Sequence, residues 1–196
     1  MKKGFVYTVA FMVILSALLT FALAFSYEAF KPSIATHRQL REERAVLYAF
    51  GLDTVLEDKD VHALFEKLIT SGRPDGKAGY TYRDAGELRG YAVPFAGPGL
   101  WGTISGYLGV NASLDQTTGL VFTQQNETPG LGGRIDELEY KEQFRLLPIK
   151  AGTELSYGAQ GDMQIDAVTG ATQTSGAVLR ILNRVMAEDI FTGEGQ

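Results

Sequence analysis

The pattern of hydrophobic and polar positions sets residues 4–27 apart from the rest of the chain, because this stretch carries no charged side chain. As a helix it would be about 36 Å long, enough to cross a hydrocarbon core of about 30 Å. Lys2 and Lys3 precede it, so the positive-inside rule places the N-terminus in the cytoplasm and the remainder of the chain outside. The pattern predicts a single transmembrane anchor helix.

A cleaved signal peptide is the alternative interpretation of this stretch. Ala22-Leu23-Ala24 is a small-x-small triplet of the kind at which signal peptides are cut. The apolar core of a signal peptide spans about 7–15 residues, however, and Phe25 and Tyr27 extend this stretch beyond the triplet. The length favours a retained anchor.

Two helices are predicted between the anchor and the first strands. Lys31-Pro32 is expected to end the anchor helix, because proline lacks a backbone donor and clashes with the preceding turn. Residues 37–50 then read as a charged, partly amphipathic helix ending at Gly51. Apolar positions spaced by three and four predict a second helix from about Asp60 to Thr70.

Strand-like runs separated by glycines follow the turn-forming residues 71–76. The predicted strands cover residues 79–83, 88–95, 103–110 and 120–125, with a hairpin loop at 115–119. A short helix at 140–146 and a strand at 163–167 come next, before a long amphipathic helix from Thr174 onward that packs on the sheet.

These elements predict an α+β fold with a mainly antiparallel sheet and a long C-terminal helix. The predicted organisation is a cytoplasmic N-terminus and anchor (1–30), a helical connecting segment (31–72) and one globular domain (73–196).

The composition excludes several kinds of redox centre. The chain has no cysteine, which excludes disulfides, Cys-ligated iron–sulfur clusters and c-type haem attachment. Its two histidines, His37 and His62, lie in separate predicted helices, so no metal site is expected. All 23 acidic residues and 16 of the 18 basic residues follow the apolar stretch, giving that part a net charge of −7, which argues against nucleic acid as a partner. An electron carrier of this composition needs an organic cofactor.

Residues 166–172, Asp-Ala-Val-Thr-Gly-Ala-Thr, place small and hydroxyl-bearing residues where the last helix is expected to begin. A helix start presents unpaired N–H groups and the positive end of the dipole, which together favour a phosphate. The chemistry suggests a phosphate-bearing group held against Thr169, Thr172 or Thr174. The same residue types also act as ordinary helix caps.

Two glycine-rich stretches precede this segment. In residues 127–134, Glu-Thr-Pro-Gly-Leu-Gly-Gly-Arg, three glycines in four positions allow close approach of the backbone to a flat ligand. Residues 97–102, Gly-Pro-Gly-Leu-Trp-Gly, contain the only tryptophan of the chain. Trp101 could stack on a flat ligand, cover the core or contact a membrane interface.

The three stretches, in this order, resemble the FMN-binding domain shared by NqrC and RnfG. These proteins are subunits of the sodium-pumping NADH:quinone oxidoreductase and of the Rnf ferredoxin:NAD oxidoreductase. The resemblance implies FMN bound as a phosphoester to Thr172, with Asp166 positioning the threonine turn. The remaining residues of the implied flavin site are Thr169, Gly170, Ala171, Thr174, Glu127, Thr128, Gly130, Leu131, Gly132, Leu100 and Trp101. The family pattern has a histidine where this chain has Gln125, which puts a proton-relay role at that position in doubt.

The resemblance implies an electron carrier without catalytic residues of its own, anchored in the inner membrane with its FMN domain on the outer side. Its partners would be integral-membrane, flavin and Fe–S subunits of an Rnf or Nqr complex. During maturation a flavin transferase would use FAD and Mg²⁺ and release AMP. Gly-Leu-Trp-Gly resembles NqrC and the short chain resembles RnfG, so the type of complex stays open.

Two alternative functions compete with this interpretation. The first is a membrane-anchored binding or assembly module that carries no flavin. The second is a stand-alone FMN reductase, against which stands the lack of a dinucleotide-binding fingerprint in the sequence.

Overall fold

The computed structural model describes residues 2–52, 56–158 and 164–191. The chain divides into two compact units, Met1–Gln39 and Leu40–Gln196. Helix α1 (Lys2–Ala49) begins in the first unit and ends in the second. Each unit is described by itself below.

The first unit consists of α1 up to Gln39 and contains the apolar stretch of residues 4–27. Its most apolar 18-residue window has a mean hydropathy of 2.4 and is entirely exposed, so by length and composition this helix can cross a membrane. The expected break at Pro32 is wrong, because α1 continues through this residue. A proline in a helix interior removes a single backbone hydrogen bond, and the hydrogen bonds of the neighbouring residues maintain the helix. Just beyond it, the Thr36 hydroxyl donates a hydrogen bond to the Pro32 carbonyl (3.2 Å).

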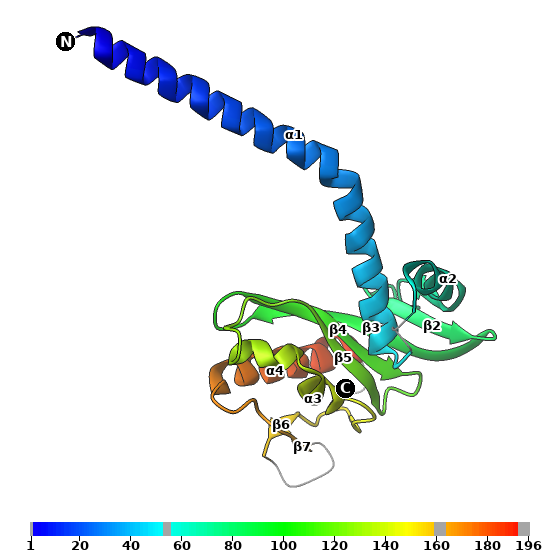
Figure 1. The fold of residues 1–196 in the computed structure, drawn as a ribbon. Helices are drawn as coiled ribbons and strands as arrows, with labels where there is room; N and C mark the ends of the chain where they lie inside the picture. Colours follow the sequence, from blue (N-terminus) through cyan, green and yellow to red (C-terminus); the bar gives the residue numbers. More distant parts are fainter. Residues whose placement is uncertain (1, 53–55, 159–163, 192–196) are drawn as a thin grey trace. The chain divides into compact units, whose positions relative to one another are not determined.

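The second unit is built on an antiparallel sheet with the strand order β1-β2-β3-β4-β5 (Figure 1). The strands are β1 (Ile69–Ser71), β2 (Tyr80–Asp84), β3 (Glu87–Pro98), β4 (Thr103–Asn111) and β5 (Thr117–Gln124). This order confirms the predicted antiparallel α+β fold. β3 and β4 form the longest pair, in register from Gly90 opposite Asn111 to Pro98 opposite Thr103. The turn after Pro98 therefore reaches one end of the sheet.

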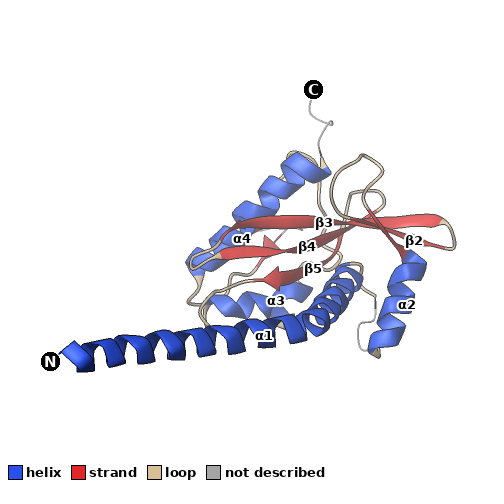
Figure 2. Ribbon diagram, turned by 90° about the horizontal axis from the view of Figure 1, so that it is seen from above, coloured by secondary structure: helices blue, strands red, loops and turns tan. Residues whose placement is uncertain are grey.

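Both faces of the sheet are covered, because alternate side chains of a strand point to opposite faces. One core joins β3, β4 and β5 to α3 (Leu138–Glu142) and α4 (Thr172–Val185), and α4 lies along β3 (Figure 2). A second core joins the end of α1 to α2 (Asp58–Leu68) and to the other face. The second unit thus includes the end of α1, α2 and β1, which come from the part of the chain predicted as a helical connecting segment (31–72).

Several predicted bounds differ from those in the structure. Strand β1 occupies the end of the helix predicted to reach Thr70. The hairpin loop is shifted, because β5 begins at Thr117, whose buried hydroxyl donates to the Phe144 carbonyl (2.7 Å). The helix predicted at 140–146 is the shorter α3, preceded by a 3₁₀ turn, η1 (Gly132–Asp136), that was not predicted.

The last predicted strand is also shorter than expected. It is β7 (Gln164–Ile165), which pairs in parallel with β6 (Ser156–Tyr157) outside the main sheet. Met163 lies outside the described residues. Helix α4 begins two residues before Thr174 and continues into a π-helical turn, η2 (Met186–Ile190).

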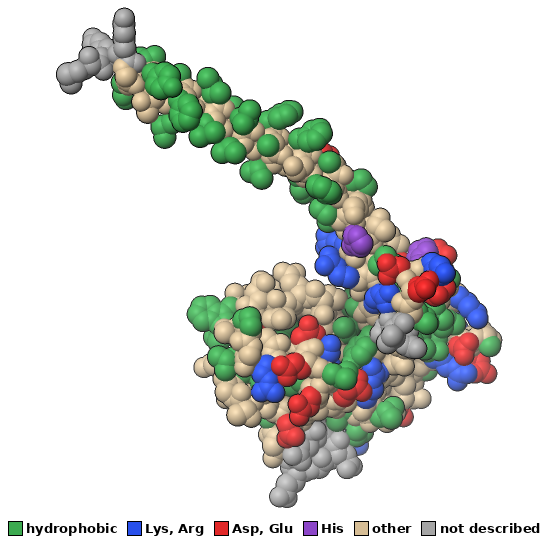
Figure 3. All heavy atoms as spheres, in the orientation of Figure 1, with side chains coloured by type: hydrophobic (Ala, Val, Ile, Leu, Met, Phe, Trp, Pro, Cys, Tyr) green, Lys and Arg blue, Asp and Glu red, His purple; other side chains and the backbone are tan. Residues whose placement is uncertain are grey.

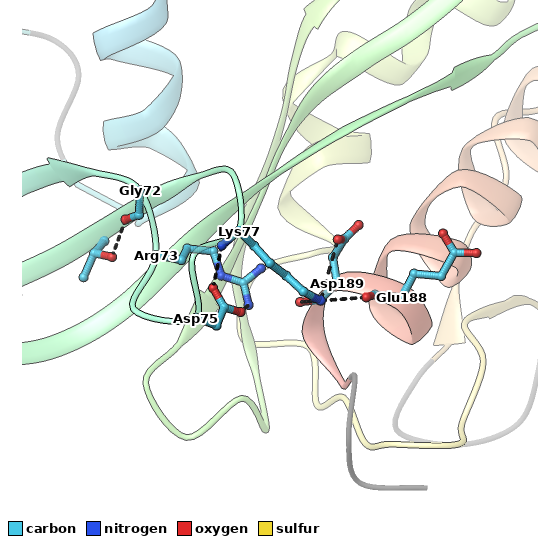
Figure 4. A network of polar contacts seen from close by, with 7 residues as sticks. Gly72, Arg73, Asp75, Lys77, Glu188 and Asp189 are labelled. Atoms are coloured by element: carbon cyan, nitrogen blue, oxygen red, sulfur yellow. Dashed lines mark hydrogen bonds and ion pairs between the residues drawn. The ribbon is translucent and has the colours of Figure 1, made fainter.

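The turn between β1 and β2 fastens the end of this closing helix (Figure 4). The Lys77 ammonium donates to the carbonyls of Glu188 (2.7 Å) and Asp189 (3.3 Å), where a helix end presents partial negative charge. In the same turn the buried Arg73 guanidinium donates to Asp75 (2.8 Å) and lies over the Tyr91 ring. The closing helix is thereby held at the end opposite its first turn.

Candidate functional site

A cavity of about 440 Å³ lies where the loop between β3 and β4, the loop after β5 and the first turn of α4 meet. We call it the α4 cavity. Its lining residues are Leu100, Trp101, Glu127, Thr128, Leu131, Gly132, Gly170, Ala171, Thr172, Gln173 and Thr174. The size falls within the range of about 300–1,000 Å³ that is typical of small-ligand sites.

The cavity gathers most of the predicted site residues from three distant parts of the chain. Asp166, Thr169 and Gly130 are the predicted residues that do not line it. Gln173 lines it but was not predicted, although its place directly after Thr172 in the first helical turn could have indicated it.

The first turn of α4 is open at its N-terminus. The residue before the helix is Ala171, and no side chain of the described residues makes a capping hydrogen bond there. Gly170 has φ +81°, a conformation that side-chain-bearing residues rarely adopt, so the chain can turn sharply into the helix. The first backbone N–H groups of α4 are therefore available to a bound anion.

Thr169 does not cap this helix, although residues of its type often act as caps. Its side chain is exposed and lies on a different cavity. The hydroxyl that organises the loop belongs instead to the buried Ser175, which accepts a hydrogen bond from the Val168 N–H (3.1 Å). Because Ser175 lies inside the helix, it tethers the preceding loop without covering the helix end.

Thr172 and Thr174 differ in accessibility, although both line the α4 cavity. Thr172, the first residue of α4, is exposed. Thr174 is only 1% exposed, and its hydroxyl donates to Glu127 Oε2 at 2.5 Å. An incoming phosphorus centre could therefore reach the hydroxyl of Thr172 but not that of Thr174.

Glu127 connects the walls of the cavity. Its side chain is buried, and Oε1 accepts hydrogen bonds from the backbone N–H groups of Leu100 (2.9 Å) and Trp101 (3.1 Å). A side chain at Gly132 would place its Cβ 2.5 Å from Thr174 Oγ1 and 2.9 Å from Glu127 Oε2. Glycine is thus required for the loop after β5 to pass this close to α4.

Three large apolar side chains surround the opening. Leu100 is 52% exposed, Trp101 68% and Leu131 48%. Figure 3 shows hydrophobic side chains gathered at the end of the domain where the β3–β4 loop lies. Among the described residues of the lining, Glu127 alone is charged, and it is buried. An apolar, planar ligand suits such walls, because exposed apolar surface at a cavity marks a binding site.

Asp166 and Thr169 line a second, polar cavity of about 500 Å³, together with Arg134, Glu137, Glu139, Tyr140, Gln143, Ala167 and Val168. Here the Gln143 side chain accepts from the Asp166 N–H (2.6 Å) and donates to the Asp166 carbonyl (3.4 Å). Burial raises the pKa of Tyr140, whose hydroxyl lies 2.6 Å from that of Tyr157, so both phenols stay neutral. Through its two hydrogen bonds, the Gln143 side chain holds the backbone of Asp166, at the start of the threonine segment (residues 166–172).

Gln125, at the position where the resemblance implies a histidine, has a local structural role. Its side-chain oxygen accepts the backbone N–H of Glu127 (2.8 Å), and Gln125 is not part of the cavity lining. Gln125 thus supports the loop after β5 through the backbone of Glu127.

Known proteins share these features. Residues 99–187, which include every lining residue of the α4 cavity, match the sequence profile of the FMN-binding domain. The chain is 28% identical to NqrC of Pseudomonas aeruginosa, a component of the Na(+)-translocating NADH-quinone reductase, over 83% of this chain and 84% of that protein. It is 35% identical to the G component of the ion-translocating oxidoreductase complex of Methanosarcina acetivorans, over 50% of each. These matches identify an FMN-binding domain in residues 99–187 and relate the chain to NqrC and RnfG.

Some of these relatives align over a smaller part of their length. The chain covers 39% of NqrC from Pasteurella multocida, at 33% identity, so it spans half or less of two of these three relatives. Among solved structures, Shewanella oneidensis NqrC has a TM-score of 0.62 at 20% identity, over 72% of this chain and 88% of that one. NqrC from Parabacteroides distasonis has a TM-score of 0.65 at 21% identity, over 79% and 92%. The two structures establish the shared fold.

Proposed function

We propose that this chain is the electron-carrying flavin subunit of an Nqr- or Rnf-type oxidoreductase and that it holds FMN covalently through the hydroxyl of Thr172. The observation that carries the proposal is the difference between the hydroxyls of the threonine segment. Thr172 is exposed on the apolar α4 cavity, Thr174 is buried against Glu127, and Thr169 lies on the other cavity.

The residues of the α4 cavity fit FMN. Leu100, Trp101 and Leu131 offer apolar surface to a flat ring system and would exclude water from it. The uncapped first turn of α4 offers N–H groups to the phosphate. When bound, the flavin supplies reversible one- and two-electron transfer, while the protein supplies attachment and orientation.

Attachment to Thr172 requires a separate flavin transferase, because a threonine hydroxyl is a weak nucleophile and the described cavity lining contains no histidine or lysine to activate it. In this step Thr172 Oγ attacks the FMN phosphorus of FAD, the bond between that phosphorus and the bridging oxygen breaks, and AMP leaves. The hydroxyl proton passes to a base of the transferase, and Mg²⁺ offsets the charge of the pyrophosphate.

The proposed location is the cytoplasmic membrane, with the N-terminus inside and the FMN domain outside. Helix α1 has the length and hydropathy of a membrane span, and Lys2 and Lys3 set its orientation. A covalent tether suits an extracytoplasmic carrier, because a flavin that dissociated there would be lost to the bulk. Residues 4–27 contain no charged group, so the coupled ion would cross through other subunits.

Intact-mass analysis of the full chain, produced together with a flavin transferase of this family, tests the proposal. The parent protein should carry one FMN phosphoester and give a fluorescent band on a denaturing gel. Thr172→Ala should remove both signals, whereas Thr174→Val should keep both. Unmodified parent protein would favour the flavin-free binding module, and a flavin retained by Thr172→Ala would show that another residue is the attachment site.

A further inference from the structure

Glu127, buried in the wall of the α4 cavity, accepts more hydrogen bonds than one wall of the cavity alone supplies. Glu127 accepts three hydrogen bonds, two at Oε1 from the loop between β3 and β4 and one at Oε2 from Thr174 in α4. A buried carboxylate is stable only when its oxygens are bonded in this way. The three donors thus belong to two different walls of one cavity.

The loop of residues 99–102, which we call the tryptophan loop, depends on this carboxylate for its orientation. One backbone hydrogen bond closes the loop internally, from the Gly99 N–H to the Gly102 carbonyl (2.7 Å). The next two N–H groups, of Leu100 and Trp101, point to Glu127. Since Trp101 is 68% exposed, the position of its side chain depends more on its backbone than on packing.

The fit around the carboxylate is close on both sides. A Cβ at Gly99 would lie 2.5 Å from Glu127 Oε1, and a Cβ at Gly132 would lie 2.9 Å from Oε2. A glycine on each side lets two backbone segments approach the carboxylate, so a displaced Glu127 would disturb both.

We propose that Glu127 is a positioning residue that holds Trp101 over the flavin of the α4 cavity by joining the tryptophan loop to the first turn of α4 through Thr174. This inference rests on the proposed function for the identity of the ligand. The connection between loop and helix involves only protein atoms and can be tested without flavin.

Trp101 reports on the connection directly, because it is the only tryptophan of the chain. The experiment measures time-resolved fluorescence anisotropy of the detergent-solubilised full chain, made without a transferase. Glu127→Ala should increase the amplitude of the fast nanosecond decay, since the two loop N–H groups lose their acceptor. Thr174→Val, which removes only the helix-side donor, should give a smaller increase. Glu139→Ala, an exposed glutamate on the other cavity, is the matched control and should decay like the parent.

A second measurement uses the protein that carries flavin on Thr172. A flavin against the indole quenches its emission, so Glu127→Ala should lose most of the quenching while intact mass shows the same flavin content as the parent. Glu127→Gln keeps the shape of the side chain and one acceptor oxygen. In both measurements its result should therefore lie between those of Glu127→Ala and the parent.

The outcomes separate the two proposals. A parent-like anisotropy decay in Glu127→Ala would overturn the positioning role, because the tryptophan loop would then be held without the carboxylate. A parent that takes up no flavin would overturn the proposed function and leave the anisotropy result to judge Glu127. If Glu127→Ala does not fold, Thr174→Val and Glu127→Gln decide, and unchanged anisotropy in both refutes the role.

Discussion

Gly132→Ala is the sharpest structural test of the α4 cavity. The added methyl group would lie 2.5 Å from Thr174 Oγ1 and 2.9 Å from Glu127 Oε2, directly beside the hydrogen bond between them. Overpacking a well-filled site costs about 1–3 kcal/mol, and leaving a buried polar group without its partner costs about 1–3 kcal/mol. Because both effects disturb the same side-chain contact, their energies are not fully additive, and we expect the free energy of unfolding to fall by about 2–5 kcal/mol.

Thermal unfolding followed by circular dichroism measures this loss. For a domain of roughly 150 residues the melting temperature should fall by about 5–20 °C. Gly133→Ala is the matched control, because it adds the same methyl group one residue later, where the nearest atom is the Thr128 carbonyl oxygen at 3.3 Å. That variant should melt within about 3 °C of the parent. A parent-like melting temperature for Gly132→Ala, or an equal fall in both variants, would refute the close approach of the loop to α4.

Three further predictions concern the rest of the domain. The hydrogen bond to Glu43 raises the pKa of His62 in the folded protein. The stabilisation by His62 should therefore be complete below about pH 6.5 and be lost as the pH rises through the folded pKa. The difference in melting temperature between the parent and His62→Gln, measured as a function of pH, tests this. Lys77→Met should lower the free energy of unfolding by about 0.5–2 kcal/mol in urea titration, because the end of η2 loses its cation. Thr169→Ala should change that free energy by less than about 0.5 kcal/mol by the same method, because its exposed side chain caps no helix in the described part of the chain.

The elements that the sequence predicts well are those whose pattern is local. Alternation and glycine spacing located β3 and β4, and the helical period located α4. The predictions fail where the surroundings of a residue override its local preference. Ile69 belongs to a helical pattern by spacing, yet it pairs with Tyr82 of β2, and Pro32, a helix breaker by chemistry, lies inside α1. The residues next to Ile69 and Pro32 in the sequence reveal neither the strand partner of Ile69 nor the helix that continues through Pro32.

The same division applies to the candidate site. The three loops were found because each carries a recognisable motif, and the residues that meet in the α4 cavity are mostly those that the resemblance implied. The motifs did not predict which of their residues line the α4 cavity and which lie elsewhere. Asp166 and Thr169 lie six and three residues before Thr172, but the loop turns at Gly170 and places them on the other cavity.

The distinction between the two threonines of α4 shows why a motif alone cannot assign a modification site. Thr172 and Thr174 have the same chemistry and lie in the same helical turn, so the motif alone does not distinguish them. What separates them is Glu127, 47 residues upstream of Thr174, whose side chain accepts a hydrogen bond from the Thr174 hydroxyl inside the core. To carry a phosphoester, the Thr174 oxygen would have to give up that hydrogen bond and bring a phosphate against Glu127, a cost that the exposed Thr172 avoids. In the proposed assignment, the tertiary structure leaves Thr172 as the accessible hydroxyl, through the same carboxylate that contacts the tryptophan loop.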